Sequence, residues 1–425
     1  MTRKTSMRNM RNILKKAVAT VVLAAMTVIF TGPVFAHGER AQQANLRIRS
    51  MNWYDMEFST TELAVNEILV LKGKMQASGF WPEHIPGVDG NVYLNIGSAG
   101  PTFVRLSSKI NGQSVIQSTS LEYGETYDFE VVLKARRPGR YHLHPLLNVE
   151  DTGALVGPGR WIVITGDQAD FTNTAETMFG NVIDMENFWL TEIFTWHAIW
   201  LAIGLAWFLY WVRPTNRPVL LMRYRMVKAK LDADEDPDDL IPFRENIVGA
   251  VVLVLTLILV GAGFFWADQK FPVTTPLRSA TVKVFPTDLG IQNVEAEVVD
   301  ATYRIPGRSF RMKVKVTNNG DSPVQMGEFL IANIRFINPD VMDIQPIDSH
   351  DLVAPNGLRV PDGVVQPGET RDITVYAEDA MWETWRLTTL INDPDSLIVG
   401  MAFFFAEDGE RSVIEIGGPM LPVFE

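Results

Sequence analysis

Two long apolar segments in the middle of the chain constrain its fold more than any other feature. They cover residues 193–212 and 247–267; the first has tryptophans near both ends, and the second contains no charged residue. About 20 consecutive apolar residues are enough for a helix to cross the hydrocarbon core of a bilayer, and tryptophan is enriched at both membrane interfaces. The sequence therefore predicts two transmembrane helices.

The loop between these segments, residues 213–246, predicts their orientation. It holds seven basic side chains, and its acidic run at 232–239 has little influence on topology. Since basic loops stay on the cytoplasmic side, we expect the two polar segments, 37–185 and 268–425, to lie together on the opposite, periplasmic side of a bacterial inner or intracytoplasmic membrane.

The first 36 residues read as a secretory signal peptide that is cleaved. Six basic residues precede an apolar stretch from Ala17 to Phe30, and Val34 and Ala36 occupy positions −3 and −1 of a cleavage site. The apolar stretch is shorter than the roughly 20 residues of a spanning helix. The alternative is a retained membrane anchor; cleavage after Ala36 would make His37 the mature N-terminus.

Charge and cysteine content exclude several classes of function. The signal holds six of the 38 Lys and Arg and none of the 50 Asp and Glu, so the mature chain has 32 basic against 50 acidic residues. Such an acidic exported chain is a poor partner for nucleic acid. The absence of cysteine excludes disulfides, iron–sulfur clusters and the thiolate of blue-copper centres, so any metal must be held by nitrogen and oxygen donors.

The two polar segments both show the alternation of β-strands. Tyr127, Phe129, Val131 and Leu133 alternate with polar residues, and residues 310–316 do the same before the turn at 318–321. Gly-Glu-Thr precedes an alternating run at 124–126 and again at 368–370. The sequence therefore predicts a mainly β protein with two cupredoxin-like β-sandwich domains, 37–185 and 268–425, joined by two transmembrane helices.

Three of the six histidines can be linked by a chemical argument. A histidine at a free N-terminus offers its amino and ring nitrogens as a chelate, and the amine has an ordinary pKa near 8. His142 and His144 are two residues apart in an extended stretch, so their side chains point to the same face. Together with His37 they form a nitrogen-rich donor set that suits copper.

The His-x-His pair and the histidine after the cleavage site each have a simpler interpretation. A His-x-His pair occurs on ordinary strands, and some residue must follow every cleavage site. Glu39 is a candidate hydrogen-bond acceptor beside the metal, although a solvated carboxylate near a terminus is the simpler expectation. We expect His197 to lie at the membrane interface, and His84 and His350 to be solvated in loops.

Several longer motifs resemble the B subunit of particulate methane and ammonia monooxygenases, and the similarity covers nearly the whole mature chain. The motifs are His-Gly-Glu-Arg at 37–40, Asn-Trp-Tyr-Asp at 52–55, residues 133–139 running into His142-Leu143-His144, Gly-Pro-Gly-Arg-Trp at 157–161, residues 316–324, and Glu-Ile-Gly-Gly-Pro at 415–419.

The resemblance implies a function that spacing alone does not show. In this family two cupredoxin-like periplasmic domains and two membrane helices assemble with subunits A and C into a trimer of heterotrimers in the membrane. The complex uses copper and O₂ to hydroxylate methane, short alkanes or ammonia. The family's copper ligands match His37, His142 and His144.

One departure from the family pattern concerns a second copper. Some members hold it with a histidine where this chain has Asn52 and a glutamine that we match to Leu397, and leucine cannot ligate a metal. The resemblance therefore implies that this second site is absent. Two other functions stay open: a copper-loading or scaffold subunit with catalysis in a partner, and a free periplasmic copper carrier. The motif at 135–139 favours the hydrocarbon branch of the family over ammonia.

Overall fold

The computed structural model describes residues 42–424 except 178–179, 213–219, 273–280, 306–308, 342–351 and 394. These residues form two compact units. One contains the described residues up to Phe171 together with those after residue 280, and the other contains the described residues from Thr172 to Pro272. His37, Glu39 and His350 lie outside the described residues.

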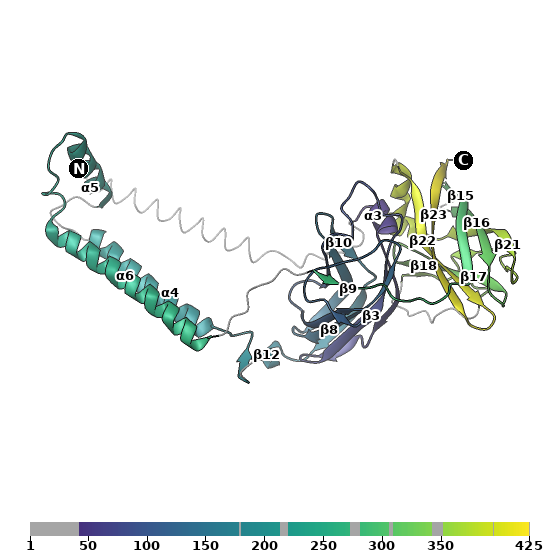
Figure 1. Ribbon diagram of the computed structural model, residues 1–425, viewed down its shortest axis with the longest axis horizontal. Coiled ribbons are helices and arrows are strands. Elements are labelled where there is room, and N and C mark those ends of the chain that lie inside the picture. Colours follow the sequence, from purple (N-terminus) through teal and green to yellow (C-terminus); the bar gives the residue numbers. More distant parts are fainter. Residues whose placement is uncertain are drawn as a thin grey trace, which may run out of the picture. The chain divides into compact units, whose positions relative to one another are not determined.

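The N-terminal part of the first unit is a β-sandwich of two sheets (Figure 1). One sheet has the order β1 (Met51–Phe58), β3 (Ile68–Ala77), β8 (Thr126–Ala135), β5 (Phe103–Ile110) and β6 (Gln113–Ser114). The other has the order β14 (Val282–Lys283), β7 (Thr119–Ser120), β4 (Val92–Gly97), β9 (Gly139–Val149), β11 (Arg160–Thr165) and β2 (Glu62–Ala64), with β10 (Gly153–Val156) paired to β9. Apolar side chains from both sheets, among them Leu71, Val131, Leu143 and Ile162, form one core.

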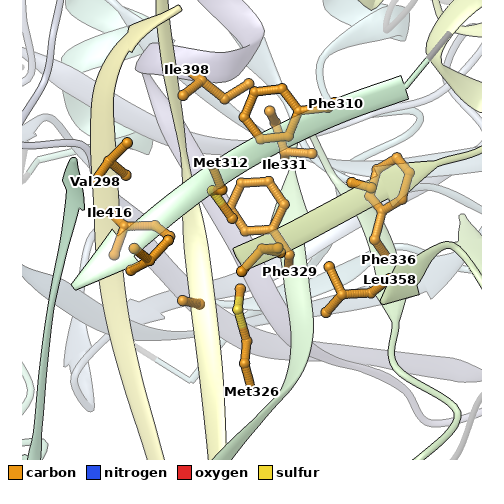
Figure 2. Close-up of a cluster of buried hydrophobic side chains, with 14 of the residues drawn as sticks. Val298, Phe310, Met312, Met326, Phe329, Ile331, Phe336, Leu358, Ile398 and Ile416 are labelled. Atoms are coloured by element: carbon orange, nitrogen blue, oxygen red, sulfur yellow. The ribbon is translucent and has the colours of Figure 1, made fainter. Parts of the chain in front are cut away.

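The C-terminal part is a second sandwich made from one nine-stranded path. Its order is β19 (Val353–Ala354), β18 (Ile334–Ile337), β17 (Val324–Ile331), β22 (Leu397–Ala406), β23 (Arg411–Val423), β15 (Val294–Arg304), β16 (Ser309–Asn318), β21 (Thr370–Glu378) and β20 (Leu358–Arg359). The long strand β23 joins the two halves. Phe310 from β16 stacks on Phe329 from β17, with ring centroids 6.4 Å apart, in the core that Figure 2 shows.

The alternation read from the sequence is confirmed in both sandwiches. In β8 the residues 127, 129, 131 and 133 are buried, and in β16 the residues 310, 312, 314 and 316 are buried. Burial of every second side chain is what a strand with one face against a core requires. The prediction of a mainly β protein is therefore confirmed.

The repeated Gly-Glu-Thr motif marks the same turn in both sandwiches. Gly124 and Gly368 have φ of 78° and 72°, a left-handed conformation that glycine adopts without steric cost. The Gly124 amide donates to Ala77 at the end of β3 (2.7 Å), and the Gly368 amide donates to Asn318 at the end of β16 (2.8 Å). The internal echo in the sequence therefore corresponds to a repeated structural element.

Two elements pack with the sandwich that is formed mainly by the other half of the chain. Strand β14, which the sequence placed in the second domain, pairs with β7 of the N-terminal sandwich. Helix α3 (Ala44–Arg49) lies in the first predicted domain, yet its residues Ala44 and Ile48 are part of the C-terminal core. The alternation within one strand cannot show such exchanges, because they depend on which distant segments of the chain pack together.

The second unit contains the two predicted membrane helices, α4 (Leu190–Val212) and α6 (Phe243–Lys270), which lie side by side in Figure 1. Both are long and apolar enough to cross a membrane. They extend beyond the predicted 193–212 and 247–267 by a few residues at the ends.

The predicted loop 213–246 contains the helix α5 (Leu220–Asp232), and the hairpin β12 (Thr174–Glu176) and β13 (Val182–Asp184) precedes α4. Two short helical turns in the first unit, η1 (Gln168–Asp170) and η2 (Leu387–Asn392), and helix α7 (Met381–Thr384) complete the described elements.

Contacts between the two sandwiches include a buried phenol and an ion pair. Tyr54 on β1 packs edge-on against Phe403 on β22 and shares a hydrogen bond of 3.2 Å with Thr126. Next to it, Arg411 donates to both carboxylate oxygens of Asp55 at 2.9 and 2.6 Å. Burial raises the pKa of Tyr54 to about 12.

This pKa predicts a specific response to alkaline pH. A folded-state pKa above the unfolded value of about 10 means that Tyr54 stabilises the fold below pH 10 and that this contribution is lost as pH rises toward 12. The Tyr54→Phe variant loses one hydrogen bond, so it should unfold more easily than wild type at pH 8. Between pH 10 and 12 wild type should lose up to roughly 2–3 kcal/mol more than the variant.

Thermal unfolding of the full-length protein in detergent at pH 8, 10 and 11.5 measures this difference. Tyr93→Phe, which removes a phenol that is 46% exposed, is the matched control. Parallel pH dependence of wild type and Tyr54→Phe would contradict the prediction.

Candidate metal centre

His142 and His144 lie on β9 in the interior of its sheet. Strand β4 pairs on one side, with Gly97 opposite His144, and β11 pairs on the other, with Trp161 opposite His142. Leu143, between the two histidines, is fully buried in the sandwich core. Because neighbouring side chains on a strand alternate, the core position of Leu143 directs both imidazoles to the opposite face.

The two imidazoles present their nitrogens to each other. His142 Nδ1 and His144 Nε2 are 2.7 Å apart, and the ring centroids are 4.4 Å apart. The other ring nitrogen of His144, Nδ1, lies 3.0 Å from the carbonyl oxygen of Gly157. A carbonyl oxygen only accepts, so His144 Nδ1 is the donor, and Nε2 of the neutral ring carries the lone pair that faces His142.

The segment that leads into β11 fits closely around the pair. A methyl group on the Cα of Gly159 would overlap His144 Cε1 and would lie 2.7 Å from His142 Cε1. Only glycine leaves room there for both rings. Trp161 packs against the ring of His142 with centroids 4.9 Å apart, and the guanidinium of Arg140 lies 4.4 Å from the centre of the Trp161 ring.

This arrangement fits a transition-metal ion bound by imidazole nitrogens. Two nitrogens that ligate one ion at about 2.0 Å lie roughly 2.8–3.4 Å apart, which a small rotation of either ring provides. His144 Nε2 already has its lone pair directed at this point, and His142 Nδ1 gains one when its proton moves or leaves. The hydrogen bond from His144 to Gly157 fixes which nitrogen faces the ion, as is usual for ligating histidines.

The third predicted ligand is not among the residues that the structure describes. Within the described residues, no third His, Cys, Asp or Glu joins the pair in a cluster suited to a metal. Nevertheless Gln42, five residues after His37, is held in place because its side-chain amide donates to the carbonyl of Ala154 on β10. Ala154 is only three residues from Gly157, which contacts His144.

The remaining histidines lie apart from the pair. His84 is exposed, as the sequence predicts. His197 is in α4, seven residues after its start at Leu190, and its Nδ1 donates to the carbonyl of Ile193 at 2.7 Å, a bond within its own helix. The position of His197 at the membrane interface stays a prediction.

Asn52 on β1 has a neighbour on β23 of the second sandwich. The side chain that reaches Asn52 is Glu415, whose carboxylate lies 3.5 Å from Asn52 Nδ2 and accepts from Gln76 at 2.9 Å. Leu397 pairs with Pro419, four residues or about 13 Å along β23 from Glu415. Asn52 and Gln76 are both 2% exposed, and a bond of 2.7 Å joins them.

The motif at 157–161 is visible in the sequence, but nothing in the sequence assigns a role to its residues Gly157, Gly159 and Trp161. Two glycines just before a strand are a sign of close backbone approach, and this signal was present. What that backbone approaches depends on the pairing of β9 with β11, which the sequence does not show.

Comparison with known proteins finds a matching family model, a relative of similar length and a similar solved domain. The family model for the B-subunit protein of monooxygenases matches residues 38–424. The "Particulate methane monooxygenase alpha subunit" of Methylococcus capsulatus (strain Bath) is 40% identical over 410 residues, which are 96% of this chain and 97% of that protein. Among solved structures, the cupredoxin domain of amoB from Nitrosocaldus yellowstonii is 18% identical with a TM-score of 0.24, and covers 31% of this chain and 96% of its own.

The close fit around Gly159 predicts the effect of one added methyl group. Gly159→Ala should displace one or both imidazoles and lower the affinity for copper at least about tenfold. Changes to the groups that surround and orient metal ligands typically lower metal affinity by about 10–100-fold. Copper titration of the purified protein against a competing chelator measures the affinity.

Gly90→Ala is the matched control, because a methyl group there would meet only the carbonyl of Gly87 at 3.7 Å. Equal copper affinities for Gly159→Ala and Gly90→Ala would show that the fit around the pair has no role in metal binding.

Proposed function

Because this chain belongs to the family of monooxygenase B subunits, we propose that it is the copper-binding subunit of a membrane-bound monooxygenase. His142 and His144 supply two of the copper ligands, and His37 supplies the others through its amino and ring nitrogens. The observation that carries this proposal is the convergence of His142 Nδ1 and His144 Nε2 on one point from one face of β9.

The chain length between His37 and the described residues supports the third ligand. An extended chain covers at most about 3.6 Å per residue, so the five residues before Gln42 reach about 18 Å. Gln42 is bonded to Ala154, and the three residues from Ala154 to Gly157 cover no more than about 11 Å. A mature N-terminus at residue 37 is therefore within reach of the imidazole pair.

The described groups around the imidazole pair bind and orient, and we assign none of them to acid–base chemistry. Gly157 holds the proton of His144 on Nδ1, and Gly159 allows both rings to approach. Trp161 limits rotation of the His142 ring and keeps water from one of its faces. Bound copper would supply the one-electron redox chemistry that O₂ activation requires.

The family and the relative support a proposal for partners, location and substrate. We propose that the chain assembles with subunits A and C as a trimer of heterotrimers, and that α4 and α6 cross the membrane with both sandwiches on the periplasmic side. The relative carries methane in its name, which supports a hydrocarbon substrate for this complex, with short alkanes or ammonia as alternatives.

Removing both imidazoles tests the proposal. The double variant His142→Ala/His144→Ala, purified within the assembled complex, should lose the copper bound by this chain and should lose nearly all turnover of methane, because one terminal histidine cannot hold the ion alone. Copper content by elemental analysis and turnover by product formation are the two measurements.

His84→Ala is the control, since it removes an exposed histidine elsewhere on the same domain. If the double variant keeps full turnover once copper is supplied to the complex, catalysis belongs to a partner, and this chain is a scaffold or copper-loading subunit.

The proposed chelate also predicts the first residue of the mature chain. Intact-mass measurement and N-terminal sequencing of the purified complex should give His37 with an unmodified amino group. A chain that starts one residue earlier or later, or that keeps its leader, has no imidazole at its terminus and would exclude this ligand.

A further inference from the structure

A pocket of about 560 Å³ opens at the end of the helix pair where α4 begins and α6 ends. It lies within the second compact unit and is lined by Thr177, Asn181, Ile183, Asp184, Asn187, Phe188, Trp189, Glu192, Lys270, Phe271 and Pro272. The volume is in the range of sites for small organic molecules. Nothing in the proposed copper chemistry uses this pocket.

The pocket carries both signs of charge. Glu192 in the first turn of α4 and Lys270 in the last turn of α6 form an ion pair of 2.6 Å. The ammonium of Lys270 also lies 4.9 Å from the ring centre of Trp266 and 5.9 Å from that of Phe271. Asp184, held by Asn187 at 2.6 Å, adds a second carboxylate to the lining. Two carboxylates and one ammonium thus line the same space.

Trp189 lies in the pocket wall, and its indole N–H has no acceptor within the described ranges. Its Nε1 is buried and has no hydrogen-bond acceptor among the residues that the structure describes. A buried donor that makes no hydrogen bond is costly, so an acceptor from outside the chain would satisfy it. Trp189 also has φ of 62°, an uncommon conformation for a bulky residue that is often found at binding sites.

An apolar groove adjoins the pocket. It has a volume of about 310 Å³ and is lined by the aromatic and aliphatic side chains of the helix pair, including Trp196, Trp200 and Phe264. Trp189 lines both the pocket and the groove. Gly263 also lines the groove, and a methyl group there would lie 3.4 Å from the Trp196 ring. A polar pocket that continues into an apolar groove matches an amphipathic molecule.

We propose that the pocket and groove together bind a membrane phospholipid with a primary-amine headgroup. Lys270 and the Trp189 indole N–H bind the phosphate, Asp184 and Glu192 bind the ammonium, and an acyl chain lies along the groove. Complementary charge favours this zwitterion, because an anionic headgroup has no cation to place beside the two carboxylates. The inference rests on the proposed function only in requiring that α4 and α6 span a bilayer.

Photocrosslinking in the assembled complex tests the site directly. The complex is reconstituted in nanodiscs that contain phosphatidylethanolamine or phosphatidylglycerol, each with a photoreactive acyl chain. The amine lipid should label peptides that cover residues 189–200 and 259–267, and the glycerol lipid should label them at least about tenfold less. Equal labelling by both lipids, or labelling of other peptides only, would overturn the proposal.

Charge variants separate the two parts of the headgroup. Asp184→Asn/Glu192→Gln should lose the preference for the amine lipid, whereas Lys270→Gln should lower labelling by both lipids about tenfold, as expected when a charge-assisted hydrogen bond is lost. The control is Lys230→Gln, which breaks another ion pair of 2.6 Å, with Asp239, away from the pocket. Unchanged labelling in both pocket variants would also overturn the proposal.

Two further measurements distinguish this inference from the copper proposal. The pocket variants should keep the copper content of wild type, and His142→Ala/His144→Ala should keep the lipid labelling. Mass spectrometry of small molecules retained by the wild-type complex identifies the natural occupant; a quinone or a free phosphate compound in place of the phospholipid would exclude the assignment.

Discussion

The pairing of β9 with strands on both sides is the constraint on which the candidate metal centre depends. Strands β4 and β11 fix its register, and Leu143 fills a core position between the two imidazoles. A slip of one residue would move Leu143 to the outer face and would bury both histidines in an apolar core. The packing of the sandwich therefore fixes the orientation of the two imidazoles. A shifted register would cost the free energy that is needed to disrupt the core.

Features with a short sequence period could be predicted. The alternation in β8 and β16, the repeated Gly-Glu-Thr turn and the two apolar helices all depend on residues within one element. The shared face of His142 and His144 belongs to the same class, since it requires only that the stretch be extended. These are local properties, because the order of residues within one element determines them.

Features that depend on pairing between distant segments could not be predicted. Gly159 and Trp161 meet the histidines only because β11 lies beside β9. Glu415 reaches Asn52 across 363 positions in the sequence, and β14 joins the N-terminal sheet although it follows helices α4 and α6 in the sequence.

No histidine of the second sandwich lies within the described residues, yet contacts of this sandwich reach the chain segments around the candidate metal centre. The hairpin between β17 and β18 turns at Ala332 and Asn333, both with positive φ, as a two-residue turn of this kind requires. Arg47 of α3 donates to the Ala332 carbonyl, and Asn333 donates at 3.0 Å to Val156, the residue before Gly157. This turn thus contacts both α3 and β10, and β10 ends directly before Gly157, whose carbonyl accepts from His144. The C-terminal sandwich fixes the relative positions of the two chain segments that the proposed ligand set must bring together.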